Sequence, residues 1–102
     1  MTEVIWTPDA RADLLDIYIL IGVEQPAAAE RYLDRIEQKA HLLARHPRIG
    51  VRRPDIRPAF RMMVEQPYLI LYRTEPDTDD GPILVAEIVR IIDGRREISQ
   101  LF

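Results

Sequence analysis

Apolar residues in the first half of the chain recur with the spacing of helices. A short apolar run, Glu3 to Trp6, predicts a first strand. Thr7 then has the character of an N-cap and Pro8 that of a first helical residue, with Asp9 near the positive end of the helix dipole. The positions expected to form the buried face of this helix are Ala10, Leu14, Ile17, Tyr18 and Ile21, and those expected opposite them are Arg11, Asp13 and Asp16.

A second helix is predicted between Pro26, which suits a helix start, and Pro47, which closes it. Its buried stripe is expected to consist of Ala29, Tyr32, Leu33, Ile36, Ala40 and Leu43. Gly22 ends the first helix only a few residues earlier. So short a connection predicts that the two helices form an antiparallel hairpin.

The second half of the chain is rich in β-branched and aromatic residues, which favour strands. The prolines and the glycine between Pro47 and Pro58 exclude a helix there and predict an ordered loop. Three strands are expected after it, at Phe60–Val64, Tyr68–Arg73 and Ile83–Ile92. Their connections suit antiparallel hairpins, and the nearly continuous apolar run of the third predicts a central strand covered on both faces.

These elements together predict an α+β fold, in which an N-terminal strand and an antiparallel two-helix hairpin pack on a small, mainly antiparallel β-sheet. Residues 1–102 are expected to form a single domain, because a chain of this length supports one hydrophobic core. The apolar tail, with Ile98, Leu101 and Phe102, is expected to close that core. An exposed tail that binds a target is the alternative.

Composition excludes several classes of protein. The chain has no cysteine, so disulfides, thiolate catalysis and cysteine zinc sites are excluded. No apolar run approaches the roughly 20 residues of a membrane span, and Glu3 stands where a signal peptide has basic residues. We therefore expect a cytoplasmic protein that does not bind a membrane.

The net charge of −3 conceals a local excess of arginine. Residues 1–44 contain eight acidic and four basic residues, and residues 62–102 contain the same numbers, whereas residues 45–61 contain six arginines and one aspartate. The acidic balance argues against direct nucleic-acid binding by this chain, which would need many phosphate contacts. The basic segment can still bind one acidic partner.

The arginines in and beside the predicted loop allow two interpretations of equal weight. They are Arg48, Arg52, Arg53, Arg57 and Arg61. They either pair with the acidic faces of the helices or contact a partner. Arginine outnumbers lysine thirteen to one in the chain, which favours planar bidentate contacts, although the coding preference of a source genome produces the same bias.

No set of side chains predicts catalysis, a metal site or a cofactor. His41 and His46 are five residues apart and so lie on different faces of the second helix, which does not suit a zinc pair. Ser99, the only serine, lacks the neighbours of a hydrolase nucleophile. The acidic segment from Glu75 to Asp80 lacks the spacing of a calcium loop and is expected to be a solvated hairpin tip.

Two charged residues interrupt the last predicted strand. Glu87 and Arg90 are three residues apart and are expected on opposite faces. Because a buried charge needs a partner, each either pairs within the fold or meets another protein. The candidate partners within the fold are Arg61, Arg73 or Arg95 for Glu87, and Glu65 or Asp93 for Arg90.

Several short motifs occur in a fixed order along nearly the whole chain. They are Trp6-Thr7-Pro8 with Ala10, Asp13-Leu14 and Ile17; Gln25-Pro26-Ala27-Ala28 with Ile36; Leu43 to Pro47 with Gly50; Arg61; Tyr68-Leu69-Ile70-Leu71-Tyr72-Arg73; and Ile88-Val89-Arg90 with Gly94-Arg95-Arg96. In this order they resemble the ParE toxins of the RelE/ParE toxin–antitoxin superfamily. The fold that this resemblance implies, a helical hairpin on a small antiparallel sheet, is the one that the apolar pattern predicts.

The resemblance implies a non-enzymatic toxin that traps DNA gyrase on cleaved DNA and serves plasmid stabilisation. It also implies a cognate ParD-like antitoxin that binds the toxin in a hetero-oligomer. We expect the antitoxin to occupy exposed parts of the helical hairpin and the sheet, with Asp55, Arg57, Arg61 and Glu87 as specificity contacts. The residues expected to contact the target are Arg52, Arg53, Arg73, Arg90, Arg95 and Arg96.

Two alternatives to a gyrase toxin remain open. The RelE-like, ribosome-dependent mRNA endonucleases share the fold, but they need several basic residues and a histidine or tyrosine near the C-terminus. Here the only lysine is Lys39, the last tyrosine is Tyr72, and Asp93 stands where many relatives have histidine. The second alternative is a toxin-derived interaction domain without toxic activity.

Overall fold

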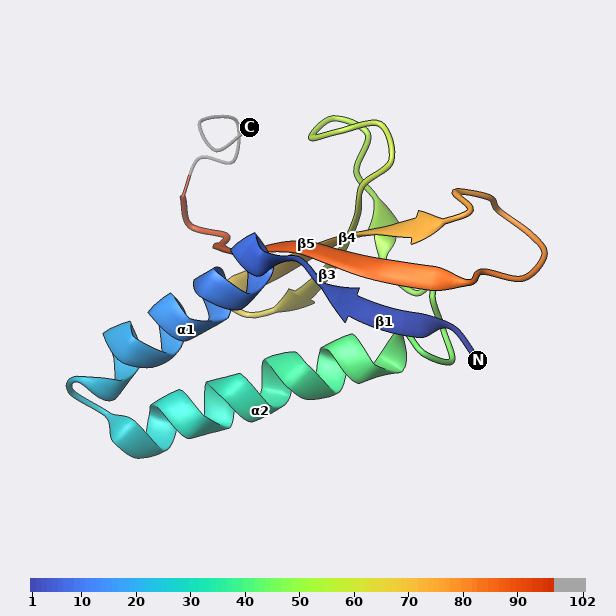
Figure 1. Cartoon of the computed structure of the whole chain (residues 1–102). Coiled ribbons are helices and arrows are strands. Elements are labelled where there is room, and N and C mark those ends of the chain that lie inside the picture. Colours follow the sequence, from blue (N-terminus) through green and yellow to red (C-terminus); the bar gives the residue numbers. More distant parts are fainter. Residues whose placement is uncertain (97–102) are drawn as a thin grey trace.

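The computed structural model describes residues 1–96 of the chain as two helices and five strands. In chain order they are β1 (Glu3–Trp6), α1 (Pro8–Gly22), α2 (Pro26–Leu42), β2 (Val51–Arg52), β3 (Arg61–Glu65), β4 (Tyr68–Glu75) and β5 (Val85–Asp93). Figure 1 shows the helices side by side as an antiparallel hairpin on one side of the sheet. The predicted tail contacts of Ile98, Leu101 and Phe102 lie outside the described residues.

The five strands form one mixed sheet with the order β1-β5-β4-β3-β2. β1 runs parallel to β5, and the other three pairs are antiparallel. The parallel pair is possible because the helical hairpin carries the chain back across the sheet. The predicted α+β fold with a mainly antiparallel sheet is therefore confirmed, and β5 has neighbouring strands on both sides, as its apolar run predicted.

The helix starts follow the sequence signals. Thr7 caps α1, because its Oγ1 accepts a hydrogen bond from the Ala10 N–H at 3.0 Å. The same hydroxyl donates to the carbonyl of Val89 at 2.8 Å, which joins the start of α1 to β5. α2 begins at Pro26 as predicted but ends at Leu42, before Pro47, and the residues between continue as turns.

The main core lies between the helices and the sheet. Tyr32 of α2 meets Tyr68 of β4 edge to face, with ring centroids 5.7 Å apart. The buried residues of this core are Ala10, Ile36, Ala40, Leu43, Met63, Tyr68, Ile70, Tyr72, Ala86, Ile88 and Ile91. A smaller cluster of Phe60, Leu71 and Ile92 covers the opposite face of the sheet, so β4 and β5 are buried on both faces.

Three features of the sheet differ from the predictions. The strand β2 lies within the predicted loop, and its two residues pair with Arg61 and Met62. A strand of two residues is too short to show the alternation of apolar and polar residues by which strands are predicted. β4 and β5 extend to Glu75 and Asp93, beyond their predicted ends. A register shift at Leu71/Tyr72 places Glu87 opposite Arg73 and Arg90 opposite Leu71. The expectation of opposite faces is wrong, because this irregularity breaks the alternation.

Asp13 was predicted to lie opposite the buried face of α1. In the structure it instead joins α1 to β5. Its carboxylate accepts hydrogen bonds from Arg90 Nε at 2.6 Å, from Arg90 Nη2 at 3.0 Å and from the Ile91 N–H at 2.9 Å. The hydrogen bond to Asp13 raises the pKa of Arg90. Neither Glu65 nor Asp93 is therefore the partner of Arg90, because α1 brings a closer carboxylate.

The Asp13 contact predicts a large loss of stability on substitution. We expect Asp13→Ala to lower the free energy of unfolding by about 2–3 kcal/mol, because Arg90 and the Ile91 N–H lose their acceptor. Asp16→Ala removes the same charge from the exposed side of the same helix. This control should change the free energy of unfolding by less than about 0.5 kcal/mol. Urea unfolding measures both, and equal values for the two variants would contradict the assignment.

Candidate functional site

The predicted arginine-rich loop lies against an acidic loop, residues 76–84, which joins β4 to β5. Arg48 holds this loop by its backbone: Nε donates to the Thr78 carbonyl at 2.9 Å, and Nη2 donates to the Gly81 carbonyl at 2.8 Å. Gly81 has φ 78°, a left-handed conformation that favours glycine. The acidic loop is thus an ordered partner of the arginines, and not only a solvated hairpin tip.

Arg52 pairs with two aspartates of the acidic loop. Its Nη1 lies 3.0 Å from Asp77 Oδ1, and its Nη2 lies 2.8 Å from Asp79 Oδ1. The hydrogen bond from Arg52 lowers the pKa of Asp79, and the hydrogen bonds to Asp79 and Asp77 raise the pKa of Arg52. Arg48 and Arg52 therefore contact this loop, and the alternative in which they pair with the acidic helix faces is wrong for these two arginines.

Arg61 is the most buried of the predicted binding residues, with 6% of its surface exposed. Its Nη1 donates to the carbonyls of Gly50 at 3.2 Å and Arg48 at 3.4 Å. Its Nη2 is 3.6 Å from Asp79 Oδ1, and among the described residues its buried Nε has no acceptor. This guanidinium is positioned by backbone carbonyls and has no close carboxylate of its own.

Tyr72 fixes the backbone that carries these arginines. Its fully buried hydroxyl donates to the Pro47 carbonyl at 2.9 Å and accepts from the Gly50 N–H at 2.8 Å. Burial raises the pKa of this phenol. A Cβ at Gly50 would lie 2.5 Å from Tyr72 Cε1, so the close approach of loop and ring requires glycine.

The other predicted contact residues are spread over the molecule. Arg53 and Asp55 pair locally, with Arg53 Nη2 2.8 Å from Asp55 Oδ2, and Arg57 is exposed on the same β2–β3 connection. Glu87 accepts from Arg73 Nε at 2.7 Å across β4 and β5, which confirms one of its candidate partners. Asp55, Arg57, Arg61 and Glu87 thus lie on three elements, and the structure does not bring them together as one cluster.

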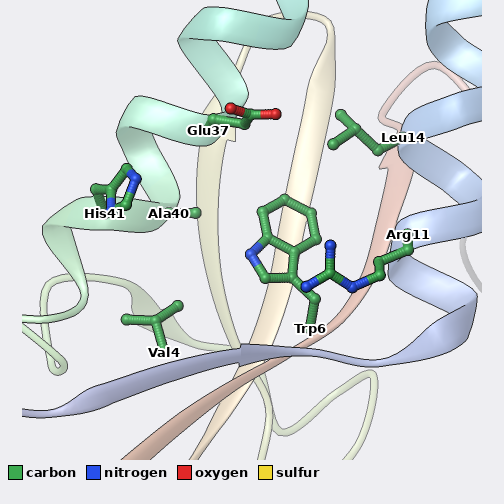
Figure 2. A pocket seen from close by; sticks show the side chains of 7 residues that line it. All are labelled: Val4, Trp6, Arg11, Leu14, Glu37, Ala40 and His41. Atoms are coloured by element: carbon green, nitrogen blue, oxygen red, sulfur yellow. The ribbon is translucent and has the colours of Figure 1, made fainter.

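A pocket of about 270 Å³ opens between β1, α1 and α2. Figure 2 shows the indole of Trp6 directed into the space between the helices, with Arg11 reaching toward it from α1. Glu37 and His41 line the pocket from α2. Within residues 1–96 the side chains of Arg11 and Glu37 form no hydrogen bond or ion pair. The pocket therefore combines an apolar floor with two unpaired charges at its rim.

α1 carries apolar side chains on its solvent side as well as on its core side. Leu15, Ile19 and Val23 recur every four residues and are 57%, 53% and 79% exposed. Leu20, beside them, is 75% exposed. These four residues form what we call the α1 stripe. A helix that is apolar on both sides is typical of one that is buried on both sides, so the α1 stripe is a candidate contact surface.

Neither surface has the groups of a metal centre, since residues 1–96 contain no cluster of three His, Cys, Asp or Glu side chains that could hold an ion. Within the same residues no helix has the length and apolar character needed to cross a bilayer. The geometry supports binding of another molecule, either through the arginines beside the acidic loop or through the apolar side chains of the α1 stripe.

Comparison with known proteins identifies the family. The family described as "ParE toxin of type II toxin-antitoxin system, parDE" matches residues 4–98. This chain belongs to the ParE toxin family. The match covers the N-terminal strand, the helical hairpin and the whole sheet, so it accounts for the order of motifs along the sequence.

Individual relatives agree with this family. Toxin ParE3 of Caulobacter vibrioides is 38% identical over 71 residues, which are 70% of this chain and 64% of that protein. Toxin ParE1 of Mycobacterium tuberculosis is 31% identical over 98 residues, 92% of this chain and 91% of that protein. A solved structure of the chromosomal ParDE toxin–antitoxin system from P. aeruginosa matches with a TM-score of 0.72 and 27% identity, covering 91% of this chain and 96% of that one.

Sequence reasoning missed three parts of this ParE-family surface. It treated Asp77 and Asp79 as part of a solvated tip, although an acidic segment in a chain that also has an arginine-rich segment was a signal for pairing. It did not find the pocket at Trp6, which requires three elements to meet. It assigned Tyr18 to the buried face of α1 and overlooked the α1 stripe, whereas Tyr18 is 37% exposed at the edge of the core.

The C-terminal end of β5 is closed by a local ion pair. Asp93 accepts hydrogen bonds from the Arg95 backbone N–H at 2.9 Å and from Arg95 Nη2 at 2.6 Å. These two bonds lower the pKa of Asp93 to about 2. Of the two arginines expected to contact the target here, Arg95 is therefore already engaged, and Arg96 is exposed beside it.

The Asp93 pair predicts a specific pH dependence. Arg95→Gln should raise the pKa of Asp93 from about 2 toward 3.8. Because the folded-state pKa is depressed, the pair stabilises the fold above about pH 4, and its contribution disappears as the pH falls through about 2. Carboxyl-carbon NMR titration measures the change. An unchanged Asp93 pKa in this variant would show that Arg95 is not the cause.

Proposed function

We propose that this protein is the toxin of a ParDE pair, that it inhibits DNA gyrase in the cytoplasm, and that a ParD-like antitoxin neutralises it in a hetero-oligomer. The observation that carries the proposal is the family match over residues 4–98, together with the fold shared with a ParDE structure. The buried, hydrogen-bonded hydroxyl of Tyr72 and the ion-paired Asp93 further support a toxin that acts by binding.

The geometry favours a non-enzymatic toxin over a RelE-like nuclease. Tyr72 is fully buried, and its hydroxyl already donates one hydrogen bond and accepts another. It therefore cannot reach a ribose hydroxyl as a general base. Asp93 is ionised at neutral pH and bound to Arg95. A carboxylate at this position repels phosphate instead of stabilising it.

The target assignment has a direct test. We expect the purified protein to inhibit supercoiling by DNA gyrase and to leave ribosome-bound mRNA intact, because no general acid or base is placed for RNA cleavage. Supercoiling assays and primer extension on translating ribosomes measure the two activities. Expression of the protein alone should arrest growth, and co-expression of a cognate ParD-like antitoxin should restore it. Ribosome-dependent cleavage would assign the chain to the nuclease branch, and no growth arrest would indicate an interaction domain.

We propose further that the antitoxin lies along the α1 stripe. The stripe is the most exposed apolar surface of the helical hairpin, and its removal from water would stabilise a complex. The pocket at Trp6 lies beside the same helix and has room for one apolar side chain of the antitoxin. Arg11 and Glu37 at its rim offer an unpaired charge of each sign for selection of the partner.

The α1 stripe predicts the position at which antitoxin binding is most sensitive. Ile19→Lys should weaken antitoxin binding at least about ten-fold, which corresponds to about 1.4 kcal/mol, because a charge enters an apolar contact. Folding should be little changed, since Ile19 is 53% exposed. Gln38→Lys, on the exposed side of α2, is the matched control. Calorimetric titration that gives equal affinities for both variants would place the antitoxin elsewhere.

A further inference from the structure

Arg61 has an unusual combination of burial and incomplete pairing. Its guanidinium is almost completely removed from water, yet its two hydrogen bonds go to neutral carbonyls, at 3.2 and 3.4 Å. Its Nε has no acceptor among residues 1–96, and its nearest carboxylate oxygen is 3.6 Å away. A buried cation with so little compensation is costly, and a close oxyanion would remove most of that cost.

The carboxylate nearest to Arg61 belongs to a side chain that is bound closely by Arg52 and only at longer distance by Arg61. Asp79 is 85% exposed and is bound by Arg52 at 2.8 Å. It lies on a loop that Arg48 holds through backbone groups, so its side chain can turn away while the loop keeps its place. Asp79 is thus a replaceable ligand between two guanidinium groups.

We propose that Arg52 and Arg61 form a binding site for a carboxylate side chain of an acidic partner segment, and that Asp79 occupies this site as an internal ligand. The incoming carboxylate displaces Asp79 and approaches Arg61 more closely than Asp79 does. Two guanidinium groups directed at one carboxylate give the planar, charge-assisted hydrogen bonds for which arginine is suited. The proposal defines the partner by its charge and does not depend on gyrase or an antitoxin.

A carboxylate fits the surroundings better than the phosphates of a nucleic acid. The present occupant is itself a carboxylate, whose Oδ1 lies 2.8 Å from Arg52 Nη2 and 3.6 Å from Arg61 Nη2. Asp77 and Asp80 lie close to Asp79 in the sequence, and a nucleic acid would bring several closely spaced phosphates near them, whereas a peptide can present a single carboxylate to the site. A single carboxylate therefore meets less repulsion from these aspartates than a run of phosphates does.

The test compares two asparagine substitutions in the same loop. Asp79→Asn frees the site from its internal ligand and should increase the affinity for a fluorescein-labelled, glutamate-rich peptide about ten-fold, because the site no longer has to be vacated. Asp80→Asn removes the same charge from the neighbouring position, and its side chain forms no ion pair within residues 1–96. This control should change the affinity less than about two-fold. Fluorescence anisotropy at low ionic strength measures both.

Three further measurements make the outcome decisive. The double variant Asp79→Asn with Arg52→Gln should not show the increased affinity for the glutamate-rich peptide. Thermal unfolding should show that each variant is folded. The matching glutamine-rich peptide should bind no tighter to Asp79→Asn than to the unmodified protein. Equal gains for Asp79→Asn and Asp80→Asn, a gain for the glutamine peptide, or a gain seen only with a single-stranded oligonucleotide would each overturn the proposal.

Discussion

The hydroxyl of Tyr72 is the contact on which the arginine-bearing surface depends. Tyr72 stands on β4, in the main core, and its hydroxyl accepts one hydrogen bond from a loop more than twenty residues earlier in the chain and donates another to the same loop. Those bonds determine the path of residues 47–50, and the Gly50 carbonyl in turn positions the guanidinium of Arg61. No side chain fits between the ring and Gly50, so this close approach of loop and strand requires glycine at position 50.

A consequence of this arrangement is that most arginines of the predicted binding sets already have partners inside the chain. Arg52, Arg53, Arg73, Arg90 and Arg95 each form an ion pair. Most of these pairs are at least partly exposed, where each contributes little to stability and exchanges readily. Binding through such residues is an exchange of carboxylates, so its specificity depends on how well the incoming group competes with an internal one. A count of positive charges alone would not describe this surface.

The features that the sequence predicted correctly are those determined by interactions between residues close together in the chain. Thr7 and Pro8 place the start of α1, because a cap and a first-turn proline act within a few residues, and the apolar stripe of α2 predicts its buried face. The misses involve contacts between distant segments. Asp13 and Arg90 are 77 residues apart, and no periodicity links them. The register shift in β4–β5 likewise follows from packing in three dimensions, so strict alternation misplaced Arg90 relative to Glu87.

The candidate site was less predictable than the fold for the same reason, and its two surfaces differ in what they require of a partner. The charged groups around Arg52 and Arg61 are largely compensated within the chain, so a partner gains affinity there only by improving on Asp79. The α1 stripe has no such competitor, since water is its alternative. We therefore propose that apolar burial on α1 supplies most of the affinity for a partner, whereas exchange at the arginines selects which acidic segment binds. The pattern of apolar residues in the sequence cannot show which surface supplies affinity and which supplies selectivity. That distinction depends on which charges already have partners within the folded chain.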